Sequence, residues 1–575
     1  MTNIKHIRLQ KLRDHMAARD LDGYLVWRAD MFSGEEVRPC DERLEMISGF
    51  TGSAGYALIL SDSAYVFSDG RYHLQMEQQL DKAHWQWRDS APNALSEILK
   101  DIVPSTGALQ LGYDAQTTTL AQARRLPHHA GEQTMVWHAL SDSLIDPIWD
   151  DRPHPDAEPA YALRDSQTGK TAAHKLDELQ ETLVQQGLDG LIITAVDCVN
   201  WLFNIRGKDL ANTPFHLCFA FVPQQGRPIL IEGDYDKLTS SSWSSFCESL
   251  PAGHYSIDPQ SLPMALYNQM SREDVVFTEE ACPLYLPKAM KNEIELDGFR
   301  QAHHSDAMAF LSFWYWLDHC PDLSSYHETE LVQKLQSMRQ EAPSYICDSF
   351  ETIMGSGPNG AIIHYRAIAG QDRLIDQDNL LLIDSGAHYE TGTTDITRTL
   401  LIGTADDEMR RCYSAVLSAH IALAMARFPQ GTTGAAIDAI CRAPLWAQGL
   451  DYAHGTGHGV GHILSVHEGP AHISKRAGPP LQSGMVLSNE PGFYQADQWG
   501  IRLENLVAVT EQSNGYLGFE TLTFVPFERA LIDTSQLNAE ARAWLNHYHA
   551  TIYELFHSHC SQDMAEWLSR KCQPL

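Results

Sequence analysis

The sequence lacks any apolar run near the ~20 residues that a membrane-spanning helix needs, so we expect no membrane segment. Its first residues are polar and lack the apolar core of a signal peptide. Basic residues are scarce: 42 Lys and Arg stand against 74 Asp and Glu, which gives a formal charge of −32. Nucleic acid and anionic membranes bind basic faces, so we expect neither as a partner.

Paired cysteines are also missing. The 11 cysteines include no C-x-x-C motif and are odd in number, so they cannot all form disulfides. Scattered reduced thiols are typical of a cytosolic protein, and we expect a cytoplasmic location. The hydrophobic content of 43% and charged content of 20% are those of a soluble globular protein. At 575 residues the chain exceeds one hydrophobic core, and we expect roughly two to four domains.

The N-terminal half contains an internal repeat, in which residues 12–26 align with residues 179–193. The identities are Leu12 with Leu179, Leu21 with Leu188, Asp22 with Asp189 and Gly23 with Gly190. Both copies predict an amphipathic helix, a short turn and an apolar strand. Two related α/β domains explain the repeat, and chance similarity between helix-turn-strand segments is the alternative.

Prolines and patterning predict the domain boundaries. A proline-rich stretch over 146–167 disfavours regular structure, and a second break falls near 282–287. We therefore expect domain I at 1–155, domain II at 156–286 and a third domain at 287–575, with a C-terminal extension from about residue 512. In the third domain, apolar spacing predicts a long helix over 288–317 and closing helices over 541–568.

One imidazole and four carboxylates in the third domain are candidate metal ligands. They are Asp384, Asp395, His458, Glu490 and Glu504. An apolar strand ends at Asp384 and another follows Asp395, so antiparallel pairing would bring the two together. His458 lies in the glycine-rich segment H-G-T-G-H-G, Glu490 precedes Pro-Gly, and Glu504 lies in a predicted strand over 500–507.

Each of these residues also has an ordinary interpretation, as a turn, a flexible loop or an exposed strand carboxylate. Together they favour a site for two divalent metal ions. Oxygen-rich ligation suits Mn²⁺ best, with Co²⁺ or Zn²⁺ as alternatives. Two such ions, roughly 3.5–4 Å apart, activate a water molecule for hydrolysis.

These segments resemble the pita-bread metallopeptidases, and among them the long, three-domain aminopeptidase P (Xaa-Pro aminopeptidase) family. The supporting motifs are G-P-N-G-A-I-I-H-Y at 357–365, V-H-E-G-P at 466–470 and E-P-G at 490–492. Residues 41–50 and 201–207 resemble the family's first and second domains. The resemblance implies an α/β (α+β) chain: two related creatinase-like α/β domains, then a pita-bread metallopeptidase domain with a C-terminal extension.

The resemblance also implies roles for the ligands. Asp395 and Glu504 would bridge the two ions, Asp384 would bind one of them, and His458 and Glu490 would bind the other. Glu490 would also accept the proton of the attacking water.

Further residues take roles only through the resemblance. His364 and His467 would be catalytic, beside the scissile bond, and His454 would bind substrate on the proline side of the pocket. Arg502 and Arg71 are candidates for substrate binding, with a structural ion pair as an equal alternative for each. His462 departs from the family pattern, and we expect it to be a solvated loop histidine.

The implied activity is release of the N-terminal residue from short peptides with a penultimate proline. One alternative is a prolidase-type Xaa-Pro dipeptidase, which the chain length disfavours. A non-catalytic pita-bread peptide-binding protein and a metal-free creatinase-type hydrolase are others, and the complete ligand set disfavours both. The family's habit implies a homodimer, with Trp446 as a candidate contact and burial in the core as its alternative.

Overall fold

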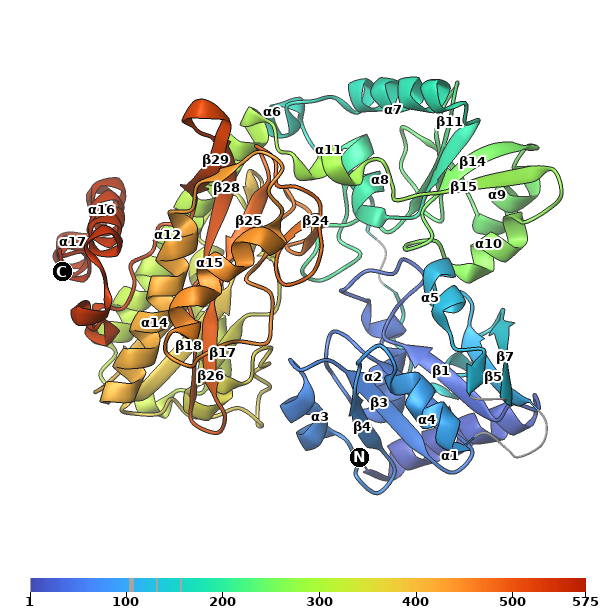
Figure 1. Cartoon of the computed structure of the whole chain (residues 1–575), viewed down its shortest axis with the longest axis horizontal. Helices are drawn as coiled ribbons and strands as arrows, with labels where there is room; N and C mark the ends of the chain where they lie inside the picture. Colours follow the sequence, from blue (N-terminus) through green and yellow to red (C-terminus); the bar gives the residue numbers. More distant parts are fainter. Residues whose placement is uncertain (1, 103–107, 131–132, 156–157) are drawn as a thin grey trace. The chain divides into compact units, whose positions relative to one another are not determined.

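The computed structural model describes residues 2–102, 108–130, 133–155 and 158–575 (Figure 1). The chain forms two compact units. Unit 1 comprises Met1–Leu163 and Lys170–Leu284, and unit 2 comprises Arg164–Gly169 and Tyr285–Leu575. Within the described ranges, no helix combines the length and the apolar character needed to cross a bilayer.

The first sheet of unit 1 has the strand order β4-β3-β2-β1-β5-β7-β6. Its strands are β1 Gly23–Trp27, β2 Tyr56–Leu60, β3 Ala64–Ser68, β4 Gln86–Asp89, β5 Leu109–Asp114, β6 His129–Ala130 and β7 Gln133–Leu140. Its helices are α1 Thr2–Ala17, α2 Arg43–Ser48, α3 His73–Gln79, α4 Ala94–Ile102 and α5 Leu120–Arg125. Along β1, Tyr24 and Val26 enter one buried cluster and Leu25 enters another, so both faces of the sheet are covered.

The second sheet of unit 1 has the order β13-β12-β11-β9-β14-β15. Its strands are β9 Gly190–Ile193, β11 Phe219–Pro223, β12 Ile229–Ile231, β13 Thr239–Ser241, β14 Gly253–Ile257 and β15 Val275–Glu279. The accompanying helices are α7 Ala172–Gln186, α8 Val196–Phe203, α9 Trp243–Ser249 and α10 Met264–Met270. β9 runs antiparallel to β11 and parallel to β14, as β1 does to β2 and β5. The matching order and directions confirm two related α/β folds.

The repeated aspartates make the same contacts in both copies. Asp22 Oδ2 accepts from the N–H of Gln110 at 2.8 Å, and its own N–H donates to the Gln110 carbonyl at 2.7 Å. Asp189 Oδ2 accepts from the N–H of His254 at 2.8 Å, and its N–H donates to the His254 carbonyl at 2.7 Å. Each aspartate therefore fastens the start of a central strand to its parallel neighbour, which explains why the residue recurs.

The two repeats also meet through equivalent segments. The N–H of Ala121 donates to the carbonyl of Pro259 at 2.9 Å, and the N–H of Ala265 donates to the carbonyl of Ala115 at 2.8 Å. Ala115 follows β5 and Pro259 follows β14, the equivalent strand. The contact is thus reciprocal, as in a two-fold interface between like folds.

Unit 2 contains four sheets, with the orders β16-β19-β20, β17-β18-β21, β22-β29-β28-β25-β23-β24 and β26-β27. The strands are β16 Tyr345–Asp348, β17 Ile353–Ser356, β18 Asn379–Ser385, β19 Ala387–Tyr389, β20 Gly392–Thr393, β21 Ile396–Ile402, β22 Phe428–Pro429, β23 Gly457–Gly459, β24 Glu468–Ile473, β25 Val486–Asn489, β26 Gly492–Gln495, β27 Trp499–Arg502, β28 Asn505–Glu511 and β29 Tyr516–Thr521. The longer helices pack with these sheets around one large buried cluster (Figure 1).

The α-helices of unit 2 are α6 Asp165–Thr168, α11 Tyr285–Ala289, α12 Glu293–His319, α13 Glu328–Arg339, α14 Asp407–Ala424, α15 Gly434–Trp446, α16 Ala539–Phe556 and α17 Gln562–Lys571. The long helix predicted over 288–317 is interrupted before α12. Asn292 caps α12, since its side chain accepts from the N–H groups of Ile294 and Glu295. The predicted closing helices are present as α16 and α17.

Candidate metal centre

Asp384 and Asp395 come from neighbouring strands. β18 carries Asp384 near its end, and β21 begins one residue after Asp395. The strands run antiparallel with Ser385 opposite Ile396, so both aspartates lie at the same end of the pair. The predicted pairing is therefore present, although the small β19–β20 hairpin replaces a simple turn between the strands.

His458 lies in β23, and Glu490 directly follows β25, an antiparallel neighbour of β23. Ser488 Oγ accepts from the N–H of His458 at 3.0 Å and lies 3.2 Å from Glu490 Oε1. The N–H of Glu490 donates to the Thr456 carbonyl at 2.9 Å. A Cβ at Gly457 would lie 2.0 Å from the Ser488 carbonyl oxygen. Glycine is therefore required for the close approach that sets His458 beside Glu490.

Glu504 lies where the chain moves between sheets. The single strand predicted over 500–507 is wrong, because β27 ends at Arg502 and β28 begins at Asn505. β27 pairs with β26, whereas β28 pairs with β25 and β29. The N–H of Glu504 donates instead to the Thr397 carbonyl at 3.1 Å, and the Thr397 hydroxyl donates to Glu504 Oε2 at 2.8 Å. The break thus turns the carboxylate toward β21.

These elements bring the predicted ligands together. Ligand atoms of Asp395, His458 and Glu504 all lie within 4.8 Å of one another. His458 Nε2 is 3.5 Å from Asp395 Oδ2 and 3.6 Å from Glu490 Oε1. Asp384 acts electrostatically on both Asp395 and Glu504. One imidazole and four carboxylates therefore share one small volume.

Burial raises the pKa values of Asp395 and Glu504 well above the usual range, and neighbouring carboxylates raise them further. For Asp395, the neighbours are Asp384 and Glu490. Among the described residues, one arginine, Arg502, forms an ion pair with a carboxylate of this cluster. The excess negative charge makes the cluster favourable for added cations.

Unpartnered oxygen atoms point to the same conclusion. Asp384 Oδ1 and Asp395 Oδ1 are buried, and neither has a hydrogen-bond partner within the described part of the chain. A buried carboxylate oxygen without a partner is costly. Hard carboxylate oxygens plus one imidazole are suitable ligands for divalent ions such as Mn²⁺, Co²⁺ or Zn²⁺. The residues present therefore fit two divalent metal ions.

His458 is oriented for ligation. Its Nδ1 lies 3.0 Å from the carbonyl oxygen of Gly459. Since a carbonyl only accepts, this contact favours the proton on Nδ1 and leaves a lone pair on Nε2. Nε2 is the atom that faces Asp395 and Glu490.

Arg502 is buried at 2% exposure. Its guanidinium donates to Asp384 Oδ2 at 2.6 Å, to the Tyr494 hydroxyl at 2.7 Å and to the Ile363 carbonyl at 3.3 Å. Burial opposes its charge, yet the pKa remains above the usual arginine range because Tyr494, Asp384 and Glu490 favour the cation. These contacts are those of a structural ion pair, which was the alternative to substrate binding for Arg502.

His454 continues the network that begins at Arg502. Its Nε2 lies 2.8 Å from the Tyr494 hydroxyl, and its Nδ1 lies 2.7 Å from the Gly455 carbonyl. Nδ1 is also 3.8 Å from Glu490 Oε2. Burial lowers the pKa of His454 to about 4, so the ring is neutral at neutral pH. A neutral imidazole therefore lies beside Glu490.

The two predicted catalytic histidines lie in segments that reach this cluster. The His467 ring is 4.3 Å from the His458 ring in an edge-on arrangement, and His467 is exposed. His364 is half-buried and follows Ile363, whose carbonyl accepts from Arg502 at 3.3 Å. The exposed edge of the cluster thus carries an imidazole outside the ligand set.

His462 is not a solvated loop residue, contrary to expectation. It is 2% exposed, its Nε2 lies 2.9 Å from the Thr391 carbonyl, and its Nδ1 lies 3.9 Å from Glu295 Oε1. Its ring also contacts Phe299 of α12. The loop folds inward here because α12 supplies both an apolar wall and a polar partner.

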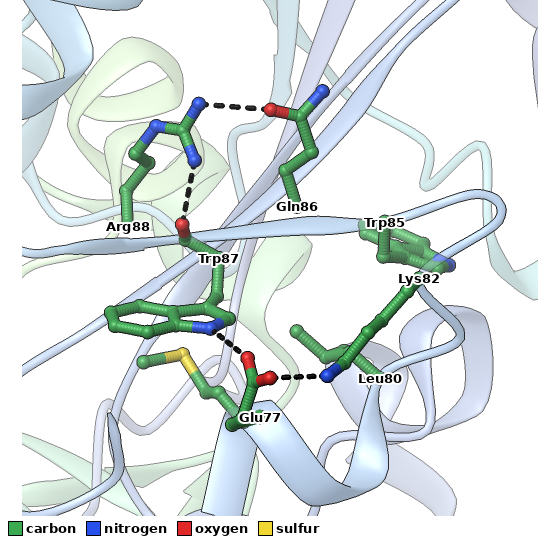
Figure 2. A pocket seen from close by; sticks show the side chains of 8 residues that line it. Glu77, Leu80, Lys82, Trp85, Gln86, Trp87 and Arg88 are labelled. Atoms are coloured by element: carbon green, nitrogen blue, oxygen red, sulfur yellow. Dashed lines mark hydrogen bonds and ion pairs between the residues drawn. The ribbon is translucent and has the colours of Figure 1, made fainter. Parts of the chain in front are cut away.

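Arg71 belongs to unit 1, where it pairs with Asp69 at 2.8 Å. Unit 1 also contains a cavity of about 450 Å³, lined by α3, β4 and the loop between them (Figure 2). Glu77 in its wall accepts from Trp87 Nε1 at 2.8 Å and pairs with Lys82. This carboxylate is already satisfied, and the cavity lining includes none of the predicted site residues.

Sequence reasoning missed two residues that organise the centre. Thr397 binds both the N–H and the carboxylate of Glu504. Its signal was its position two residues after Asp395, since alternate residues of a strand share a face. Tyr494 connects Arg502 to His454 and lies four residues after Glu490, but no spacing rule marks it.

Family models match consecutive parts of the chain. The creatinase/prolidase N-terminal domain matches residues 8–140 and, in a second model, residues 151–295. Metallopeptidase family M24 matches residues 297–511, and the C-terminal region of peptidase M24 matches residues 515–575. Together with the ligand cluster, these matches define the class as metallopeptidase.

Relatives match nearly the whole chain. A probable Xaa-Pro aminopeptidase P of Laccaria bicolor is 35% identical over 99% of this chain and 93% of its own length. Aminopeptidase P1 of Arabidopsis thaliana is 34% identical over 99% of both. The crystal structure of the X-prolyl aminopeptidase of Caenorhabditis elegans has a TM-score of 0.92 at 30% identity, covering 99% of this chain and 100% of that one.

The Caenorhabditis elegans protein is described as a cytosolic enzyme with a di-nuclear active site. The chain belongs to the Xaa-Pro aminopeptidase P family of M24 metallopeptidases. The resemblance and the α/β fold class inferred from the sequence, with creatinase N-terminal domains and a pita-bread domain, are therefore confirmed.

Proposed function

We propose that this chain is an Xaa-Pro aminopeptidase that releases the N-terminal residue from short peptides whose second residue is proline. The observation that carries the proposal is the convergence of four carboxylates and one imidazole in unit 2. Relatives that match the chain almost end to end bear the name Xaa-Pro aminopeptidase P. Family and site therefore support the same chemistry.

In this proposal the five residues would hold two divalent ions, and their carboxylate-rich chemistry suits Mn²⁺ best. By the family resemblance, Asp395 and Glu504, which are both buried, would contribute ligand oxygens to both ions. Asp384 would serve one of the ions, and His458 with Glu490 would serve the other. When bound, the ions supply a nucleophile at neutral pH and a Lewis acid for the scissile carbonyl.

Glu490 accepts the proton of the attacking water. Its Oε1 lies 3.2 Å from Ser488 Oγ, and its Oε2 lies 3.8 Å from His454 Nδ1. Both contacts orient the carboxylate without neutralising it, because a hydroxyl and a neutral imidazole carry no charge. These contacts therefore position Glu490 to accept a proton.

The imidazoles outside the ligand set contact the peptide substrate in this proposal. An Xaa-Pro bond has no N–H, so a pocket for it must orient the substrate by the carbonyl and the pyrrolidine ring. We assign the exposed His467 to the scissile carbonyl, His364 to the departing proline nitrogen, and His454 to the proline side of the pocket. Arg502 we assign to positioning Tyr494 and Asp384, in line with its contacts.

The test uses the full chain and an Xaa-Pro-Xaa tripeptide, with an Xaa-Ala-Xaa tripeptide and an Xaa-Pro dipeptide as controls. Chelation should abolish release of the first residue from the Xaa-Pro-Xaa peptide, and Mn²⁺ should restore it. Activity that survives complete chelation would sink the two-metal mechanism. Activity confined to the dipeptide would instead establish the prolidase alternative, and none on any peptide would establish a binding protein.

Three finer points belong to the proposal. Reconstitution with Mn²⁺, Co²⁺ and Zn²⁺ in turn should rank Mn²⁺ first by turnover. We also propose a homodimer with Trp446, which is 47% exposed on α15, in the contact; Trp446→Glu should shift sedimentation toward the monomer. A cytosolic location is proposed by analogy with the Caenorhabditis elegans enzyme, and cell fractionation tests it.

A further inference from the structure

A buried arginine lies directly behind the ligand cluster. Arg398 of β21 is 0% exposed. Its Nη1 donates to the Glu504 carbonyl at 2.6 Å, and its Nη2 donates to Asn505 Oδ1 and the Val525 carbonyl, both at 2.7 Å. These acceptors are all uncharged oxygens. The Phe527 ring lies 4.3 Å from the guanidinium carbon.

A buried guanidinium of this kind is costly to maintain. Moving the cation out of water carries a large penalty, and here neutral acceptors and one aromatic face compensate for it. Apolar side chains of similar volume often stabilise a core as well as buried charges do. Packing alone therefore does not explain Arg398, whereas its contact with the backbone of Glu504 does.

The Glu504 backbone depends on this arginine. Glu504 falls in the break between β27 and β28. Its N–H is held by the carbonyl of Thr397 at 3.1 Å, and its carbonyl is held by Arg398, the next residue in β21. Two consecutive residues of one strand thus fix both peptide groups around Glu504.

Tyr548 connects this arrangement to the C-terminal helix α16. Its hydroxyl accepts from Arg398 Nη2 at 3.0 Å and donates to the Thr523 carbonyl at 2.9 Å. The ring stacks on Trp544, with centroids 5.1 Å apart and planes 9° apart. Tyr548 therefore holds the guanidinium at Nη2, whereas Nη1 binds Glu504, and the Tyr548 hydroxyl is itself held by the segment after β29.

We propose that Arg398 and Tyr548 are positioning residues for the metal centre, so that the C-terminal region takes part in setting the bridging carboxylate Glu504. This inference rests on the proposed function only in taking Glu504 as a metal ligand. The chain of contacts runs from α16 through Tyr548 to Arg398 and then to the Glu504 peptide. Residues outside the direct ligands commonly tune metal affinity in this way.

The test compares Arg398→Lys and Tyr548→Phe in the full chain. Lysine keeps the charge but cannot span Glu504, Asn505 and Val525 at once. Phenylalanine keeps the ring but removes the hydroxyl that Arg398 contacts. Each variant is stripped of metal, and Mn²⁺ affinity and stoichiometry are measured by calorimetry and elemental analysis. Arg398→Lys should bind Mn²⁺ about 10- to 100-fold more weakly, with a smaller loss for Tyr548→Phe.

Tyr553→Phe is the matched control. Tyr553 lies on the same helix, and its ring stacks on His557. The Mn²⁺ affinity of the Tyr553→Phe variant should equal that of the wild type. The double variant of Arg398 and Tyr548 should lose less affinity than the two single losses combined, because both act through one contact.

The outcomes separate positioning from general stabilisation. Weaker Mn²⁺ binding with an unchanged melting temperature of the metal-free protein supports the inference. Unchanged Mn²⁺ affinity, with or without lower metal-free stability, overturns it. If Arg398→Lys does not fold, the Mn²⁺ affinity and metal-free melting temperature of Tyr548→Phe alone test the inference. A wild type that binds no Mn²⁺ would overturn the proposed function itself, which is a distinct result.

Discussion

The two units compensate their buried and half-buried carboxylates in different ways. In unit 1, Asp146 pairs with Arg43 and Arg152, each at 2.7 Å, and Asp41 pairs with Arg38 at 3.0 Å. In unit 2, the carboxylates of the ligand cluster face one another, and a single arginine in the described chain pairs with them. Unit 1 supplies these counter-charges from its own side chains, whereas this cluster of unit 2 has Arg502 as its one arginine partner among the described residues.

This difference is local and not a general property of unit 2. Elsewhere in that unit, Asp306 pairs with Arg339 at 2.7 Å in a fully buried contact. Glu468 is held by Lys288 at 2.8 Å and also by Lys291. Unit 2 can therefore neutralise buried acids with its own side chains, so the uncompensated cluster marks a site.

Asp30 is the informative exception in unit 1. It is 1% exposed, and its Oδ2 has no hydrogen-bond partner within the described residues. Burial, and then the charge of Asp41, raises the pKa of Asp30 to about 6. A lone buried acid can thus hold a proton, whereas a cluster of four can be relieved by binding cations.

The largest expected effect is that of Asp395→Asn. This change keeps the shape but removes a charge from the centre of the cluster, so kcat/KM should fall by about 10³-fold or more. The metal-free protein should melt no lower than the wild type, because repulsion with Asp384 and Glu490 is relieved. Kinetics and calorimetry check both parts. Near-normal turnover would remove Asp395 from the site.

Asp30→Asn should change the pH dependence of stability. The folded state holds the Asp30 proton more tightly than the unfolded chain, whose carboxyl titrates near 3.8. Its stabilising contribution is therefore complete below about pH 4 and is lost as the pH rises through about 6. Relative to wild type, the variant should gain about 2 kcal/mol in free energy of unfolding between pH 4 and 7.

Denaturant titrations of the metal-free protein at both pH values measure this gain. Asp62→Asn is the control, since Asp62 is an exposed acid of unit 1. If the free energy of unfolding varies with pH in the same way for wild type and Asp30→Asn, ionisation of Asp30 does not destabilise the folded state, and the prediction is wrong.

A smaller effect tests the equivalence of the two repeats. Asp22→Ala and Asp189→Ala each remove one side-chain bond to a backbone N–H at 2.8 Å. Each should lower the free energy of unfolding by about 1 kcal/mol, and the two values should agree because the contacts are the same. Metal affinity should not change in either variant. Clearly unequal losses of stability would show that the two copies share their strand order but not the energy of this contact.

The smallest effect is expected for Arg71→Met. The Arg71–Asp69 pair is partly exposed, with side-chain exposures of 28% and 38%, so its loss should cost less than about 1 kcal/mol. If Arg71 acts only in this pair, KM for an Xaa-Pro-Xaa peptide should stay within the error of the wild-type value. A raised KM with unchanged kcat would restore Arg71 as a substrate contact.

Strong local signals carried the sequence predictions. The Leu-Asp-Gly repeat predicted two related domains. The structure explains why these residues recur, since each aspartate makes the same contact at the start of a strand. Apolar strands around Asp384 and Asp395 predicted their antiparallel pairing. The continuous strand predicted through Glu504 is wrong, because an apolar alternation does not reveal that the chain changes its partner strand at that point. His462 was misjudged for a similar reason: its partners lie far away in the sequence.

The sequence by itself determined the family, the repeat and the residue types of the ligand cluster, because strand patterns and motif spacing are local properties of the chain. The tertiary structure alone decided how those residues are charged and held. Burial and mutual proximity raise the pKa values of Asp395 and Glu504. Contacts across more than 100 residues, such as that of Arg398 with the Glu504 carbonyl, hold the backbone of the predicted ligand. The pKa shifts and the hydrogen bonds that hold these residues depend on distances in space, which spacing along the chain does not reveal.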